Sequence, residues 1–193
     1  MSVQCRLVVA GLAWMMVLGG LAESRAASQG RARLDIKVEQ NKDKTGGGWD
    51  RRSETVELVV HVENKNLTKD YSGLKAVLYG IARDSANTKR YTLIVADKFT
   101  FDLAGGKTYT YDKSGLVTLM YDKSGSWRQG YRYYAHVVVI RDVNGQLLKA
   151  DASQSKWFKY IDNLGKFKVQ KDVFNDKCRK VGALHKYTSG MWY

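Results

Sequence analysis

Cysteine, histidine and proline are scarce in this chain of 193 residues, which has two cysteines, three histidines and no proline. We find no physical reason for the missing proline. Cys5 lies in a segment that we expect to be removed, so Cys178 has no partner and an intrachain disulfide is excluded in the mature chain. His61, His136 and His185 lie on separate segments without an HExxH motif or a neighbouring cysteine. His61 and His136 could meet across strands and bind zinc, but ordinary surface or hydrogen-bonded histidines are the more common case.

Catalytic motifs are also absent. The glycine clusters at 46–48 and 105–106 lack the strand-to-helix context and the following lysine of a phosphate-binding loop. No serine stands in a nucleophile-elbow pattern. The pentapeptide YDKSG occurs twice, at 111–115 and 121–125, and calcium binding is disfavoured there because a lysine follows each aspartate. We therefore expect a protein that is not an enzyme and binds neither a cofactor nor a metal ion.

The N-terminal residues read as an export signal. Arg6 precedes an uncharged apolar run at 7–22, and small residues flank a cleavage position after Ala26. The alternative is a retained membrane anchor, but the run is shorter than the about 20 residues that a spanning helix needs. We predict a signal peptide over 1–26 and a mature chain exported to the periplasm, the outer membrane or the extracellular space.

Acidic residues are outnumbered, since 32 lysines and arginines face 19 aspartates and glutamates, for a net charge of +13. Residues 1–26 carry two arginines and one glutamate, so the mature net charge is about +12. An exported cationic chain meets polyanions such as lipopolysaccharide, anionic phospholipid and sulfated or sialylated glycans. The alternative is a charge that only keeps the protein in solution. Nucleic acid is disfavoured, because export takes the chain away from it.

Alternating apolar and polar residues indicate β-strands throughout 32–152. The most informative stretch is 130–152, where an aromatic and β-branched run precedes the turn dipeptide Asn144-Gly145 and a polar-tolerant partner segment. This stretch predicts a β-hairpin whose first strand, 131–140, is buried within a sheet. A helix is the alternative for 74–83. The other predicted strands are 33–39, 53–64, 74–83, 91–96, 99–103, 107–111 and 116–120, with a loop at 41–52 and YDKSG turns on both sides of 116–120.

Many short strands, with no long helix and no β-α-β alternation before residue 153, predict an all-β antiparallel β-sandwich. Two motifs carry a resemblance: F-x-F-x-L-x-G at 99–105, and Y-x-Y-x-x-H-V-V at 131–138 followed by D-V-N-G at 142–145. With them, 32–152 resembles an immunoglobulin or fibronectin type III domain, and Tyr131 or Tyr133 resembles the tyrosine-corner position. The Cys–Trp–Cys core of antibody domains is missing. The export signal, lone sandwich and basic tail are together similar to immunoglobulin-like envelope proteins of bacterial type IV pilus systems.

Residues 153–193 look like a separate basic appendage. Apolar residues at helical spacing before Gly165 predict a short amphipathic helix over 156–164. We expect its apolar stripe to pack against an edge or end of the sandwich, with membrane or partner docking as the alternative. The candidate polyanion- or partner-binding residues are Trp127, Arg128, Arg132, Lys156, Trp157, Lys159, Lys166, Lys168, Lys171, Lys177, Arg179 and Lys180.

The unpaired Cys178 has three possible roles. It lies between Lys177 and Arg179, cations that lower the pKa of a thiol. It is either a buried, inert thiol or a candidate for an intermolecular disulfide, and a catalytic role is the weakest alternative.

Two functions fit these observations. The first is an exported, non-enzymatic structural or interaction module of the envelope or cell surface, associated with pili or adhesion, that contacts an envelope protein or a second copy of itself. The second is a binding module for anionic glycan, lipid or mucin-like polymer that uses the basic aromatic tail. We favour the first, because a sandwich without a recognisable site is most often a scaffold or adhesion unit.

Overall fold

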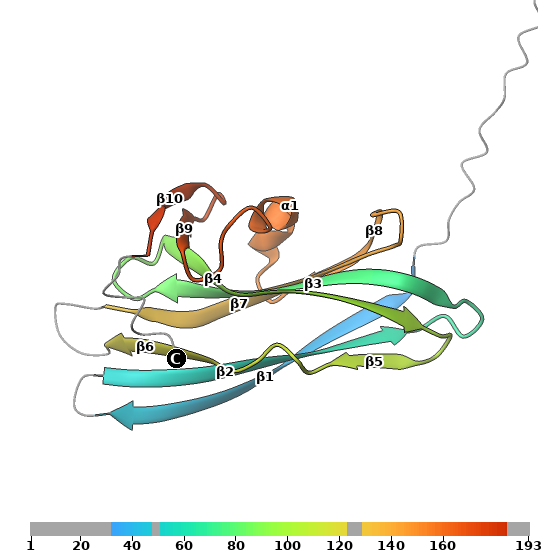
Figure 1. Cartoon of the computed structure of the whole chain (residues 1–193), viewed down its shortest axis with the longest axis horizontal. Coiled ribbons are helices and arrows are strands. Elements are labelled where there is room, and N and C mark those ends of the chain that lie inside the picture. The colour runs from blue at the N-terminus through green and yellow to red at the C-terminus, as the bar shows by residue number, and fades with distance from the viewer. Residues whose placement is uncertain (1–31, 48–50, 123–128, 185–193) are drawn as a thin grey trace, which may run out of the picture. The chain divides into compact units, whose positions relative to one another are not determined.

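The computed structural model describes residues 32–47, 51–122 and 129–184. Residues 31–193 make up one compact unit. Its described elements form two antiparallel sheets and a layer of short C-terminal elements (Figure 1). The predicted signal peptide lies outside the described residues.

Sheet A contains four strands, with β2 in the middle. Its members are β1 (Leu34–Gly47), β2 (Arg51–Asn64), β5 (Thr108–Tyr111) and β6 (Val117–Asp122). The β1–β2 register runs without interruption from Leu34 opposite Asn64 to Gly47 opposite Arg51. The predicted loop at 41–52 is therefore wrong over most of its length. Residues 41–45 are exposed on both faces of the hairpin, so no apolar alternation marks them as a strand.

The strands β5 and β6 form two parts of one path along β2, and both run antiparallel to it. The first YDKSG repeat lies between them and does not reverse the chain, contrary to the turn that we predicted. Ser114 spans the interruption: its Oγ donates to the carbonyl of Leu58 at 2.7 Å and accepts from the Leu58 N–H at 3.1 Å. A side-chain hydroxyl thus satisfies the backbone groups that a continuous strand would have paired.

Sheet B has six strands in the order β10-β9-β4-β3-β7-β8. They are β3 (Tyr71–Asp84), β4 (Arg90–Leu103), β7 (Tyr131–Arg141), β8 (Leu147–Ala152), β9 (Asp172–Asn175) and β10 (Lys180–Ala183). The predicted β7–β8 hairpin and the strand at 74–83 are confirmed. The strands predicted at 91–96 and 99–103 form the single strand β4, in which a bulge at Ile94 shifts the register.

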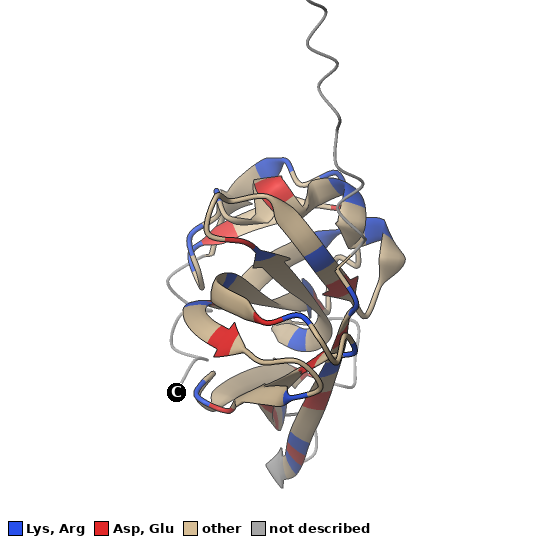
Figure 2. Cartoon of the chain, turned by 90° about the vertical axis from the view of Figure 1, so that its right-hand side faces the viewer, with Lys and Arg blue, Asp and Glu red and all other residues tan. Residues whose placement is uncertain are grey.

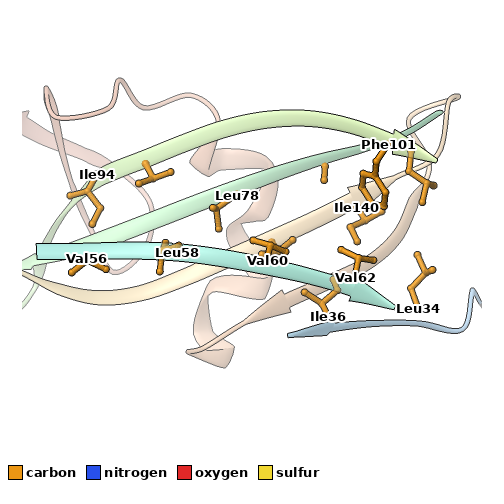
Figure 3. Close-up of a cluster of buried hydrophobic side chains, with 14 of the residues drawn as sticks. Leu34, Ile36, Val56, Leu58, Val60, Val62, Leu78, Ile94, Phe101 and Ile140 are labelled. Atoms are coloured by element: carbon orange, nitrogen blue, oxygen red, sulfur yellow. The ribbon is translucent and has the colours of Figure 1, made fainter. Parts of the chain in front are cut away.

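The core consists of two layers of apolar side chains, one on each face of sheet B. The first lies between the sheets and includes Leu58, Val60, Leu78 and Ile140, all at most 1% exposed (Figure 3). The second lies between sheet B and the C-terminal elements. Because both of its faces are covered, the middle of β7 is apolar on both sides, as predicted.

The C-terminal elements belong to the same unit as the sandwich. A 3-10 helix, η1 (Ser155–Tyr160), leads into a single turn of α-helix, α1 (Ile161–Leu164), at the position predicted for a helix. Both lie over sheet B, and β9 pairs with the start of β4, so this segment extends the sheet and is not a separate appendage.

The protein is therefore an all-β antiparallel sandwich with a short helix. The order β8-β7-β3-β4 in one sheet and β1-β2 with β5 and β6 in the other is consistent with an immunoglobulin-like fold.

Candidate functional site

Most of the predicted basic contacts lie on the surface of the C-terminal layer. Figure 2 shows that lysine and arginine share this layer with aspartate and glutamate. Lys180 is neutralised, because its Nζ lies 2.6 Å from Asp172 Oδ1. The exposed basic residues are Lys159, Lys166, Lys168, Lys171, Lys177 and Arg179.

Lys156 differs from these lysines because aromatic rings surround its ammonium group. Its Nζ donates to the Tyr91 hydroxyl at 2.8 Å and lies 4.4–4.8 Å from the ring centroids of Tyr91, Tyr134 and Trp157. Burial alone would lower the pKa of Lys156, but contacts with the two tyrosine hydroxyls leave it raised. These three rings form an aromatic box that holds the ammonium group in place, so Lys156 contributes to packing.

The side chain of Trp157 is not accessible to a ligand. Its side chain is fully buried against Tyr91 and Phe174, whose ring centroids lie 5.1 and 5.9 Å away. The alternative of membrane or partner docking through this stripe is therefore wrong for Trp157, and the expected packing onto the sandwich is confirmed.

Cys178 is a buried thiol at 8% exposure. Burial raises its pKa to about 12, and the charge of Lys156 opposes this effect only in part. The expectation that flanking cations lower its pKa is wrong, because desolvation of the thiolate is the largest effect and the opposing charge comes from Lys156. A thiol so enclosed does not fit the candidate intermolecular disulfide.

Arg132 lies at a cavity of about 390 Å³, where its guanidinium carbon is 4.7 Å from the Tyr121 ring centroid. The residues that line this cavity are Arg83, Asp84, Ser85, Thr88, Tyr121, Asp122, Arg132 and Tyr133. Arg132 was among the residues predicted from the sequence but Arg83 was not, because only the pairing of β3 with β7 places the two side by side. The other two candidates, Trp127 and Arg128, lie outside the described residues.

His61 and His136 do not form a zinc site. His61 lies on β2 of sheet A beside Glu39 and Thr110, and His136 lies on β7 of sheet B. Among the described residues, no group of three or more His, Cys, Asp or Glu side chains could hold a metal ion. His185 lies outside those residues.

His136 instead joins three strands in a buried polar cluster at 5% exposure. Its Nδ1 lies 3.1 Å from the Gln40 amide nitrogen on β1 and 2.9 Å from the Tyr133 hydroxyl, and its Nε2 lies 3.7 Å from Asp151 on β8. Since the Gln40 amide donates to Nδ1, the imidazole proton is on Nε2, facing Asp151. Lys42 and Glu54 are the other charged groups facing the cluster: Lys42 lies over the Tyr133 ring, and burial followed by the charge of Glu54 raises the pKa of Tyr133.

The pH dependence of stability is expected to reflect His136. Burial lowers its pKa below the ordinary value of 6.5, with Lys42 acting in the same direction and Asp151 against it. The unfolded chain then takes up a proton more readily, so the free energy of unfolding falls as the pH drops below about 6.5. We expect His136→Gln to flatten this fall between about pH 5 and 6.5 in urea titrations, and His61→Gln to retain it. An unchanged slope in His136→Gln would contradict the assignment.

The strand β4 has an open edge with apolar side chains beside it. β4 pairs with β3 along its length, but β9 covers its other edge only at 90–92. From Val95 to Leu103 no described strand pairs with that edge. A nine-residue stretch of backbone is thus available for pairing with another strand.

Four aromatic rings form a column between the β4 edge and β5. Phe99 stacks on Tyr111 with centroids 4.0 Å apart, and Phe101 stacks on Tyr109 at 4.3 Å. The Tyr111 hydroxyl donates to Asp97 Oδ2 at 3.3 Å, and burial raises the pKa of Asp97. The sequence contains a signal for this column, which is the F-x-F motif of β4 and the alternating tyrosines of β5. These two patterns face each other because β4 and β5 lie at the same side of the sandwich.

No helix among the described residues is long and apolar enough to cross a membrane. The sequence matches no family model and no curated protein. The fold is similar to a crystal structure from Akkermansia muciniphila, with a TM-score of 0.34, 12% identity, and coverage of 63% of this chain and 70% of that chain. It is also similar to the X-ray structure of a Northeast Structural Genomics Consortium target, with a TM-score of 0.34, 11% identity, and coverage of 63% and 86%. Similarity at this level carries no argument about function.

Proposed function

We propose that this chain is an exported, non-enzymatic interaction module of the cell envelope or surface that associates with a second copy of itself through the open edge of β4. The single observation that carries the proposal is the unpaired β4 edge at 95–103 with its aromatic column. Backbone groups on such an edge readily accept another strand, and the stacked rings add apolar area beside it.

The outer edge of β1 is protected against pairing. The outer edge of β1 carries Asp35, Lys37 and Glu39 on its solvent face, and an antiparallel pair of two copies about Lys37 would place the like charges of Asp35 and Glu39 opposite each other. The β8 strand is short, with six residues. A groove of about 400 Å³ adjoins β4, and it is lined by Ala76, Val77, Phe99 and Thr100 together with Lys75, Lys98 and Arg141.

The sequence of β4 is self-complementary around Thr100. In an antiparallel pair with Thr100 on the two-fold axis, Lys98 of one copy lies opposite Asp102 of the other, and Phe99 lies opposite Phe101. Lys98 and Asp102 are exposed, so both are available for this ion pair. The pairing would join two six-stranded sheets into one continuous sheet.

A charge exchange tests this pairing in residues 27–193, by sedimentation equilibrium and light scattering at low and high salt. We expect a dimer for the native sequence and monomers for Lys98→Glu and for Asp102→Lys, because each change places like charges opposite each other. The double variant Lys98→Glu with Asp102→Lys restores opposite charges and should restore the dimer. Lys159→Glu, on the C-terminal layer, is the control for a simple change in net charge.

Two results would contradict the proposal. One is a native protein that stays monomeric at all concentrations. The other is a dimer that Lys98→Glu leaves intact, which would place the contact on another surface. Since both altered side chains are exposed, thermal unfolding of each variant should resemble that of the native protein. The exception is Asp102→Lys, which also removes the hydrogen bond that Asp102 accepts from the Gly73 N–H.

A further inference from the structure

The cavity at Arg132 lies where β3 turns into β4, and where β6 ends beside the start of β7. Its volume of about 390 Å³ is in the range of small-ligand sites. It is separate from the β4 edge, so a ligand here would not depend on the proposed self-association.

Two arginines meet at this cavity as a cross-strand pair. Arg83 on β3 lies directly opposite Arg132 on β7, an arrangement of like charges that disfavours the folded state. Neither guanidinium makes an ion pair with a described residue. Each instead lies on a tyrosine ring, with 4.7 Å from Arg83 to the Tyr134 centroid and 4.7 Å from Arg132 to the Tyr121 centroid. No side-chain hydrogen bond joins either guanidinium to another described residue, so their N–H groups remain available to donate.

The acidic residues of the cavity do not neutralise this pair directly. Asp84 Oδ1 accepts from the backbone N–H groups of Ala86 and Asn87, at 2.8 and 3.3 Å, and so stabilises the β3–β4 turn. Asp122 also lines the cavity, and its carboxylate adds a hydrogen-bond acceptor.

Hydroxyl groups complete the lining. Ser85 Oγ is buried and has no hydrogen-bond partner among the described residues, and Thr88 adds a second hydroxyl from the same turn. A buried hydroxyl without a partner is destabilising unless another group bonds to it. The cavity is therefore lined by two guanidinium groups, by the carboxylates of Asp84 and Asp122, and by residues with hydroxyl groups, which are Ser85, Thr88, Tyr121 and Tyr133.

We propose that this cavity binds a carboxylate-bearing sugar of the uronic acid type. The guanidinium pair matches the carboxylate, which can accept two parallel N–H donors. Asp122 and the hydroxyls of Ser85 and Thr88 match the ring hydroxyls of the sugar. A simple inorganic anion would use the arginines alone and leave the acceptor and the buried hydroxyl unsatisfied.

Isothermal titration of residues 27–193 with sodium glucuronate, glucose and sodium sulfate tests the site. We expect saturable glucuronate binding that Arg83→Gln and Arg132→Gln each weaken about tenfold or more. The control Lys89→Gln removes a positive charge from the same turn without altering the cavity lining, and should change the affinity less than about twofold.

Each alternative outcome overturns the proposal. Absence of saturable glucuronate binding up to about 20 mM would remove the site. Equal losses of glucuronate affinity in Lys89→Gln and Arg132→Gln would show that only the net charge of the protein attracts glucuronate. Binding of sulfate as tight as that of glucuronate would show an anion site without sugar recognition, and equally tight binding of glucose would show that the arginines do not select the carboxylate. Matching thermal unfolding curves for the variants confirm that they fold.

Discussion

Replacing Trp157 with alanine is expected to lower the free energy of unfolding by about 3–5 kcal/mol, as measured by urea denaturation. The side chain is fully buried between sheet B and the C-terminal elements, where it contacts Tyr91 and Phe174 edge-on. The substitution leaves a large cavity in this second core and removes one wall of the aromatic box around Lys156.

Two further variants make this result specific. Phe158, the next residue, is 43% exposed, so Phe158→Ala should cost well under about 1 kcal/mol. Trp157 Nε1 is buried without a hydrogen-bond partner among the described residues, so Trp157→Phe loses volume but no hydrogen bond and should be much milder than Trp157→Ala. Equal destabilisation by Phe158→Ala and Trp157→Ala would contradict the packing of this segment onto sheet B.

Substituting Gly130 with alanine is expected to be the most damaging change of a single methyl group. Gly130 has a φ of +91°, and an added Cβ would lie 2.1 Å from the carbonyl oxygen of Met120 and 2.7 Å from the Cα of Tyr121. Its own carbonyl accepts the Ser85 N–H at 2.9 Å. The backbone of β6 or β7 must therefore move, and we expect a loss of at least about 3 kcal/mol.

Gly145 is the matched control, because it has a similar φ of +83° but nothing within 4 Å of an added Cβ. Gly145→Ala should cost only the strain of the left-handed conformation, about 1–2 kcal/mol. The difference between the two variants in urea denaturation isolates the close approach of β6 to Gly130. Equal losses would contradict that approach.

The β4 edge and the arginine cavity can be tested independently. Arg83 on β3 lies opposite Tyr91 on β4. Lys98 lies seven residues further along β4 than Tyr91, which places it about 23 Å from Tyr91 at the usual rise of a strand. Effects of variants at sites this far apart should add. Loss of dimerisation in Lys98→Glu should therefore leave glucuronate binding intact, so failure of one proposal does not imply failure of the other.

Cations over tyrosine rings recur in this protein and bear on the second sequence hypothesis. That hypothesis predicted a binding surface for anionic glycan, lipid or polymer from the cations and aromatic residues of the basic tail. Instead, the ammonium group of Lys156 lies over the rings of Tyr91 and Tyr134, and the guanidinium of Arg132 lies over the ring of Tyr121. These ring faces are covered by the protein's own cations, so the arginines, and not the rings, provide the contacts that we propose for a ligand.

The sequence by itself determined the all-β class, most of the strands, the β7–β8 hairpin, and the helix with its inward-facing Trp157. These features depend on local turn chemistry or on periodic apolar residues, and both are visible along the chain. Tertiary structure decided the rest. Residues 41–45 extend a hairpin that has no buried face, so they show no apolar alternation, and the strands predicted at 91–96 and 99–103 form one strand because β3 pairs with both.

The candidate sites depended on tertiary structure most of all. Arg83 and Arg132 are far apart in sequence and become neighbours only when β3 pairs with β7, and Cys178 is buried despite its charged neighbours because β9 brings that segment onto sheet B. Pairing between distant strands determines which side chains share a cavity and which lose their contact with water. A local pattern contains no information about either, because both depend on residues elsewhere in the chain.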